Sequence, residues 1–175
     1  TDSIMLDDIV RQLEKVYGVY YVRLSRKNAV QIYQSGSTFE IGKAAELRSG
    51  TDVTIMATGV CVAEALKAAD QLAQEGIRAA VVNMFTIKPI DREAVERYAK
   101  ETGAIVTAEN HSIYNGLSSA VAEVLAETCP VPMERVGVQD RFGQVGTVDY
   151  LREVYQLDAK TIREKALKAI SRKNK

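Results

Sequence analysis

The sequence predicts an α/β domain with a mostly parallel sheet, and three observations support this fold class. Short apolar segments typical of buried strands alternate with longer segments whose apolar residues recur every three or four positions. Glycines and polar clusters separate these segments, as expected of turns. The length of 175 residues, with 46% hydrophobic and 26% charged residues, suits one globular domain with a short extension.

The N-terminal region predicts one helix followed by one strand. Residues 2–16 carry apolar side chains at helical spacing, with Ser3 as the predicted N-cap and Gly18 as the predicted end. Residues 19–24 are β-branched and aromatic, which favours a strand. This helix and strand form a first unit.

A connector and an edge strand follow this unit. Residues 29–42 show no sustained period, so we interpret them as a connector that crosses to the main domain. Residues 43–48 suit a short edge strand that a polar turn closes. We place the boundary near Gly36, which gives expected domains of residues 1–35 and 36–175.

The main domain alternates strand patterns with helix patterns. Strands are expected at residues 53–57, 79–84, 104–108 and 133–138. Helices are expected at residues 60–75, 91–102, 115–128 and 158–175, the last with Asp158 as N-cap. This order predicts parallel strands with helices on the faces of the sheet.

Charge and cysteine content narrow the classes of function. The 23 Lys and Arg residues balance 23 Asp and Glu residues, so the chain lacks the basic excess that nucleic acid binding usually needs. Cys61 and Cys129 form no CxxC motif and suggest neither a zinc site nor a disulfide framework. No apolar run reaches the ~20 residues of a membrane span, and the start lacks a secretory signal. We expect a cytoplasmic protein whose partners are neither nucleic acid nor a membrane.

The predicted carboxyl ends of the strands are the first place to look for a site. The Thr58-Gly59 turn could present helix N–H groups to an anion, but no phosphate-binding glycine motif surrounds it, so a plain turn is favoured. Glu109 and His111 could form an acid/base pair, yet structural or interface hydrogen bonding is favoured because no motif arranges a nucleophile with them. Residues 139–146 favour an ordered interface loop over catalysis.

A second group of candidates lies at the end of the predicted N-terminal strand. Arg23 and Arg26 flank this end, and Arg26 with Lys27 combines a guanidinium fork with an ammonium group. That combination suits a phosphate or a carboxylate, and a solvated loop end is the alternative. Tyr20 and Tyr21 are expected to pack rather than stack, because adjacent strand residues point to opposite faces. These residues alone contain no self-contained catalytic set.

Several motifs, taken together and in chain order, make the sequence similar to the C-terminal part of transketolase. They are YVRLSR at 21–26, FEIGKA at 39–44, DVTIMATG at 52–59, TIKPID at 86–91, ENHSIYNGL at 109–117, DRFGQVG at 140–146 and YQLD at 155–158. The motifs cover almost the whole chain. Their spacing most closely resembles the C-terminal subunit of split bacterial or archaeal transketolases.

The resemblance implies a three-layer α/β/α domain, preceded by the last helix and strand of the pyrimidine-binding domain of a thiamine diphosphate enzyme. Transketolases transfer a two-carbon ketol unit between sugar phosphates and act in the pentose phosphate pathway. In the family, the arginine of the Leu-Ser-Arg motif helps hold the phosphate of the sugar substrate. Arg26 occupies the matching position here, and its planar fork suits that role.

The resemblance also implies which functions lie outside this chain. The family's cofactor-activating glutamate, thiamine contacts, diphosphate and metal motif and catalytic histidines belong to regions upstream of residue 1. We therefore expect no catalytic, cofactor-binding or metal-binding residue here, and inactivity of the chain alone. The complete enzyme is expected to hold thiamine diphosphate and Mg on an N-terminal partner part, with homodimer contacts.

Three other interpretations stay open. Deoxyxylulose phosphate synthases and the beta subunits of 2-oxo acid dehydrogenases share this domain, although TIKPID at 86–91 and the Leu-Ser-Arg motif favour transketolase. A stand-alone module could bind a small anion or nucleotide at the Thr58-Gly59 turn. A pure dimerisation domain is the third alternative.

Overall fold

The structure, a computed structural model, describes residues 1–26 and 29–173. Within these residues it contains a five-stranded sheet with the order β1-β3-β2-β4-β5. The strands are β1 (Ala45–Arg48), β2 (Val53–Ala57), β3 (Ala79–Asn83), β4 (Ile105–Ser112) and β5 (Met133–Val138). The last four run parallel, and β1 pairs antiparallel with β3 at one edge. The predicted α/β class is confirmed.

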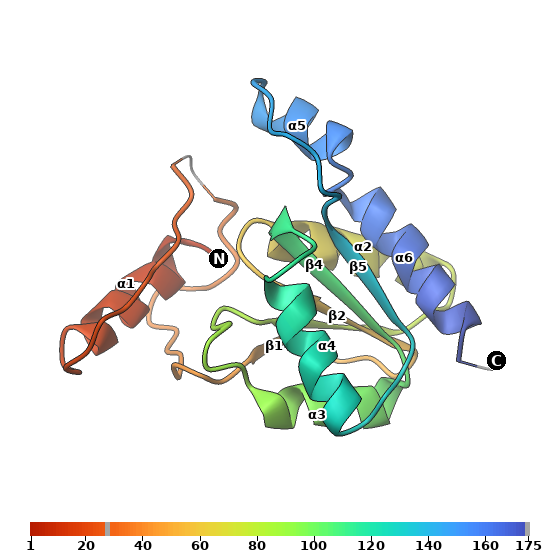
Figure 1. The fold of residues 1–175 in the computed structure, drawn as a ribbon, viewed down its shortest axis with the longest axis horizontal. Coiled ribbons are helices and arrows are strands. Elements are labelled where there is room, and N and C mark those ends of the chain that lie inside the picture. The colour runs from red at the N-terminus through yellow and green to blue at the C-terminus, as the bar shows by residue number, and fades with distance from the viewer. Residues whose placement is uncertain (27–28, 174–175) are drawn as a thin grey trace.

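Helices cover both faces of the sheet, which gives three layers (Figure 1). One face packs against α2 (Cys61–Gln74) and α6 (Ala159–Ser171), and the other packs against α3 (Arg92–Thr102) and α4 (Leu117–Glu127). Every residue of β2 and β3 is buried, as expected of parallel strands covered on both sides. The sheet therefore separates two apolar cores.

Side chains that alternate along the strands fill the two cores. Ile55 of β2 points to the core with α2 and α6, whereas Met56, the next residue, points to the core with α3 and α4. Both side chains are completely buried. This alternation fixes the register of the strands, because a shift by one residue would move each side chain to the wrong core. The register in turn sets where the strands end, beside the candidate site.

Two features of the main domain differ from expectation. The helix α5 (Val148–Val154) is not among the predicted elements; it is only seven residues long, and none of its residues is buried. The strand β4 continues to Ser112, four residues beyond the predicted end at residue 108, because Ser112 pairs with Val138 after a bulge. Glu109 and His111 thus lie within a strand rather than in the predicted turn.

The N-terminal region confirms the predicted helix and corrects the predicted strand. The helix α1 (Ser3–Leu13) begins after Asp2, whose Oδ1 accepts a hydrogen bond from the Met5 N–H at 3.0 Å, so Asp2 rather than Ser3 is the N-cap. Residues 19–24 form no strand, because no neighbouring strand in the described structure offers them backbone partners.

The connector runs from this exposed region to the start of β1 (Figure 1). The division into residues 1–35 and 36–175 stays a prediction. Among the described residues, no helix has both the length and the apolar character needed to cross a membrane.

Candidate functional site

A small pocket lies where the carboxyl ends of the parallel strands meet the N-terminal region. Ser25 and Ile32 line it from that region, Gly59 and Glu64 from the turn and helix after β2, and Arg152 from α5. We name it the carboxyl-edge pocket. Its volume of about 70 Å³ is well below the ~300–1,000 Å³ of typical ligand pockets, so it is no complete substrate site.

Arg26 directly follows Ser25 of this pocket and is exposed. The structure therefore brings the predicted anion-binding residue to the edge where ligands of such folds usually bind. A planar guanidinium can hold a tetrahedral oxyanion through two parallel hydrogen bonds. Arg23 is also exposed, whereas Lys27 lies outside the described residues.

Arg152 and Glu64 form the charged wall of the carboxyl-edge pocket. The Arg152 Nη1 lies 3.7 Å from the Glu64 Oε1 and 3.0 Å from the Asp149 Oδ1. Glu64 also accepts hydrogen bonds from the Lys67 Nζ at 2.9 Å and from the Ala159 N–H at 3.1 Å. Its carboxylate joins α2 to α5 and α6, which makes it a structural group rather than an acid or base.

The Thr58-Gly59 turn joins β2 to α2 without a side-chain cap. Gly59 has a φ of 59°, a left-handed conformation that suits glycine, and the Val62 N–H donates to its carbonyl at 3.3 Å. Burial, with nearby Glu64 and Glu109, raises the pKa of the Cys61 thiol to about 12. This geometry fits the interpretation of Thr58-Gly59 as a plain turn between strand and helix. The raised pKa makes Cys61 an unreactive thiol at neutral pH.

Glu109 caps the start of α4 from inside the sheet. Its side chain is buried, and its two oxygens accept the Leu117 N–H at 2.7 Å and the Ser118 N–H at 2.8 Å. A Cβ at Gly116 would lie 2.0 Å from the Glu109 Oε2, so only glycine fits there. The His111 Nδ1 lies on the exposed side, 3.0 Å from the Ser112 carbonyl oxygen. The structural interpretation of Glu109 is confirmed.

The loop at residues 139–146 is ordered by contacts to α5. The Arg141 Nη2 donates to the Val154 carbonyl at 2.8 Å, and the Tyr155 hydroxyl donates to the Phe142 carbonyl at 2.8 Å. Its interface role stays a prediction. In the N-terminal region, Tyr21 is exposed rather than packed as expected.

The sequence reasoning missed the carboxylates that anchor the connector. The Asp2 Oδ2 accepts from the backbone N–H groups of Ile32 and Tyr33 at 2.8 Å each. The Asp8 Oδ2 accepts from the Phe39 N–H at 2.8 Å. The partners in these hydrogen bonds are about 30 residues apart in sequence, so no local pattern predicts the contacts. An aspartate immediately before the predicted helix was the one signal that the sequence offered.

A metal site would need several ligating side chains close together. Within residues 1–26 and 29–173, no group of three or more His, Cys, Asp or Glu side chains could together hold a metal ion. The donor set needed for a diphosphate-bound divalent cation therefore does not appear in this part of the chain. The expectation that a partner part holds thiamine diphosphate and Mg stays a prediction.

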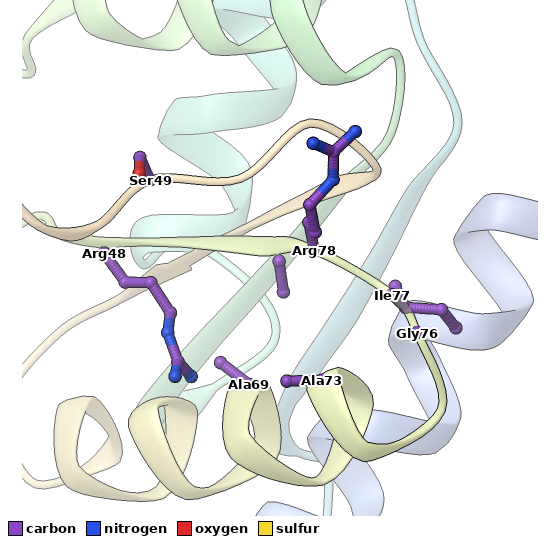
Figure 2. A pocket seen from close by; sticks show the side chains of 8 residues that line it. Arg48, Ser49, Ala69, Ala73, Gly76, Ile77 and Arg78 are labelled. Carbon is purple, nitrogen blue, oxygen red and sulfur yellow. The ribbon is translucent and has the colours of Figure 1, made fainter.

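A larger cavity of about 200 Å³ lies at the opposite edge of the sheet, beside the start of β3 (Figure 2). Ala69 and Ala73 of α2 form its floor, and Arg48 and Arg78 flank it. Figure 2 shows that these two guanidinium groups point to opposite sides of the strand. Arg48 pairs with Asp70 at 2.8 Å. The two arginines therefore do not converge on one ligand. This cavity shares no lining residue with the carboxyl-edge pocket and is separate from the candidate site.

Comparison with known proteins places these features in a family context. The model of the family described as "Transketolase, C-terminal domain" matches residues 42–162. The chain is 53% identical over 173 residues to a 6-deoxy-6-sulfo-D-fructose transketolase subunit of Clostridium sp. strain MSTE9, covering 99% of this chain and 54% of that protein. The chain thus spans about half the length of this relative.

Two further likenesses bear on the interpretation. A solved structure described as a split gene transketolase in an inactive beta4 tetramer matches with a TM-score of 0.94 and 43% identity, covering 99% of this chain and 56% of that chain. The chain is also 40% identical over 164 residues to 1-deoxy-D-xylulose-5-phosphate synthase of Heliobacterium modesticaldum, covering 92% of this chain and 25% of that protein.

Proposed function

Because this chain belongs to the transketolase C-terminal domain family, we propose that it is the C-terminal part of a split-type transketolase. The observation that carries the proposal is the likeness to the split gene transketolase structure, which extends over 99% of the chain. The likeness includes the N-terminal region outside residues 42–162, where a domain match alone would leave the function open. The complete enzyme would transfer a two-carbon ketol unit between sugars that carry an anionic group.

The proposed partner is an N-terminal part of the same enzyme that holds thiamine diphosphate and Mg. The described residues offer no cluster of metal-ligating side chains, and the exposed apolar residues between Val16 and Leu24 supply a surface for a partner. In the assembled enzyme the chain would contribute to assembly, including homodimer contacts, and would be inactive alone. A cytoplasmic location accompanies this proposal.

Arg26 is the proposed contact of this chain with the substrate. Arg26 is exposed and directly follows Ser25, which lines the carboxyl-edge pocket. Two parallel N–H donors match the oxygens of a terminal phosphate. The relative from Clostridium is described as acting on 6-deoxy-6-sulfo-D-fructose, whose sulfonate presents the same tetrahedral arrangement of oxygens. The proposed substrate class is therefore a sugar with a terminal phosphate or sulfonate.

Two alternatives are weaker on specific observations. The synthase relative is less similar, at 40% identity against 53% for the transketolase subunit. An independent anion-binding module at the Thr58-Gly59 turn lacks a pocket of adequate volume, since the carboxyl-edge pocket measures about 70 Å³. A 2-oxo acid dehydrogenase origin has no specific observation in its favour.

The test is an activity assay of this chain alone and together with its N-terminal partner, with thiamine diphosphate, Mg²⁺ and a phosphorylated or sulfonated ketose donor. We expect turnover only in the combined preparation. The R26A variant should raise the KM for the anionic donor about 10- to 100-fold, because charge-assisted hydrogen bonds contribute about 1.5–3 kcal/mol. R92A, an exposed arginine on α3, is the matched control.

Other outcomes of the assay would change the assignment. Condensation of pyruvate with glyceraldehyde 3-phosphate by the combined preparation would identify a deoxyxylulose phosphate synthase. Inactivity of both preparations with every donor would reject transketolase. Full activity of R26A with an unchanged KM would leave the transketolase assignment intact and reject the role of Arg26 in substrate binding.

A further inference from the structure

Asp2 fastens the connector to the start of α1. Its Oδ2 accepts the N–H groups of Ile32 and Tyr33 at 2.8 Å each, while its Oδ1 accepts the Met5 N–H at 3.0 Å. The residue is only 5% exposed. A single carboxylate thus satisfies three backbone donors from two separate segments.

Tyr33 has a second anchor on the sheet itself. The Asn83 Nδ2, at the carboxyl end of β3, donates to the Tyr33 hydroxyl at 2.9 Å and to the Thr1 Oγ1 at 2.7 Å. Asn83 is completely buried. Residues 32–33 are therefore held from the backbone side by Asp2 and from the side-chain side by the sheet.

The chain on the other side of Arg26 has no comparable anchor in the structure. Tyr17, Val19 and Tyr21 are almost fully exposed, and none of the hydrogen bonds found for residues 17–26 joins them to the sheet. The described residues near Arg26 that are fastened to the domain are therefore Ile32 and Tyr33 of the connector. Ser25, Thr1 and Ile32 line the same pocket, so the fastened residues and the arginine segment meet at one place.

The charge of Asp2 is maintained at neutral pH. Burial opposes its ionisation, but the hydrogen bonds from Met5, Tyr33 and Ile32 outweigh burial and hold the pKa of the carboxyl below its ordinary value. An amide in its place would direct two N–H donors or a single oxygen at the same three backbone donors. The contact to Ile32 and Tyr33 therefore depends on a carboxylate.

We propose that Asp2 is a positioning residue for Arg26: by fastening residues 32–33 to α1 and the sheet edge, it sets where the guanidinium meets the terminal anion of the substrate. This inference rests on the proposed function of Arg26. Asp2 touches no reacting atom in this account. Its effect should reach only substrates that carry the anion, because it acts through the arginine.

The experiment uses the assembled enzyme and compares a ketose donor that carries a terminal phosphate with the same ketose without it. In D2N we expect the KM for the phosphorylated donor to rise about tenfold, with kcat and the values for the uncharged donor changed less than about twofold. D7N is the matched control, since Asp7 lies on α1, which Asp2 caps, and pairs with the exposed Arg11. It should leave all values unchanged.

A double-variant cycle separates positioning from general damage to the fold. If Asp2 acts through Arg26, D2N added to R26A should raise the KM less than about twofold further. Full additivity, or equal losses with both donors, would overturn the inference. Should D2N fail to fold, Y33F removes the second anchor from Asn83 and should shift the same KM in the same direction; no shift would overturn the inference.

The same experiment distinguishes failure of this inference from failure of the proposed function. An effect of R26A with none of D2N rejects only the positioning role. An unchanged KM in R26A rejects both the substrate role of Arg26 and the positioning role of Asp2. Inactivity of the assembled wild-type enzyme with both donors rejects the transketolase assignment itself.

Discussion

The strand β2 and residues 19–24 are both rich in β-branched and apolar residues, yet they differ in burial and in backbone structure. Each residue of β2 is buried between parallel neighbours, whereas Val19 and Tyr21 are almost fully exposed and form no strand. Strand propensity describes a fit to a pleated, half-buried surface rather than an independent backbone preference. The comparison supports the proposal that a partner supplies the surface against which residues 19–24 pack.

The largest expected difference between the two regions is in stability. I55A removes a fully buried side chain of β2 and should lower the free energy of unfolding by about 2–5 kcal/mol. Y21A should change it by less than about 0.5 kcal/mol in the chain alone, because the side chain contacts mainly water. Urea unfolding measures both values. Similar losses in the two variants would show that Tyr21 is packed in solution.

A second substitution tests the buried carboxylate cap at the start of α4. G116A places a methyl group where the Glu109 carboxylate caps α4, and we expect a loss of about 1–3 kcal/mol in the free energy of unfolding. G143A is the control, since a Cβ at Gly143 meets nothing within 4 Å. Equal stability of the two variants would contradict the buried-cap arrangement.

Local patterns predicted most of the sheet domain because its helices have one apolar face and its central strands are continuous, largely apolar segments. The helix α5 escaped prediction because its seven residues are too few to show a sustained apolar period and none of them is buried. The strand at residues 19–24 was wrong because a strand needs a partner that local sequence does not specify. The Asp2 anchor joins residues 30 positions apart, so only the tertiary fold reveals it. At the site, the exposed arginine could be found by its chemistry, whereas what positions it could not.

A third prediction concerns the contact between α6 and β5. Burial opposes ionisation of Glu134, but hydrogen bonds from Lys168 and Arg172 with nearby Lys165 hold its pKa below the ordinary 4.5. A lowered folded pKa gives stability that is complete above about pH 4.5 and is lost as the pH falls through the folded value. E134Q should therefore cost about 1 kcal/mol at pH 7 and progressively less below pH 4.5.

Thermal unfolding of wild type and E134Q across this pH range checks the prediction. The difference in Tm should shrink as the pH falls. A difference that stays constant in acid would mean that the charge of Glu134 does not hold α6. The N-terminal segment takes no part in this contact, so Y21A should show no such pH dependence.

The smallest effect is a difference in thiol labelling. Cys61 is buried and its pKa is raised to about 12, whereas Cys129 is partly exposed. With iodoacetamide at pH 7.5, Cys129 should react first, and Cys61 should react only when the domain unfolds. Mass spectrometry of the labelled peptides reads out both sites. Early labelling of Cys61 would show that the start of α2 opens independently of the sheet.

We propose that the sheet domain folds by itself and that a partner completes the N-terminal segment. Hydrogen exchange of this chain, alone and with its N-terminal partner, tests it most directly. We expect the amides of residues 17–26 to exchange rapidly in the chain alone and to gain strong protection with the partner, while β2 and β3 stay protected in both. Unchanged exchange of residues 17–26 in an active assembly would contradict the account.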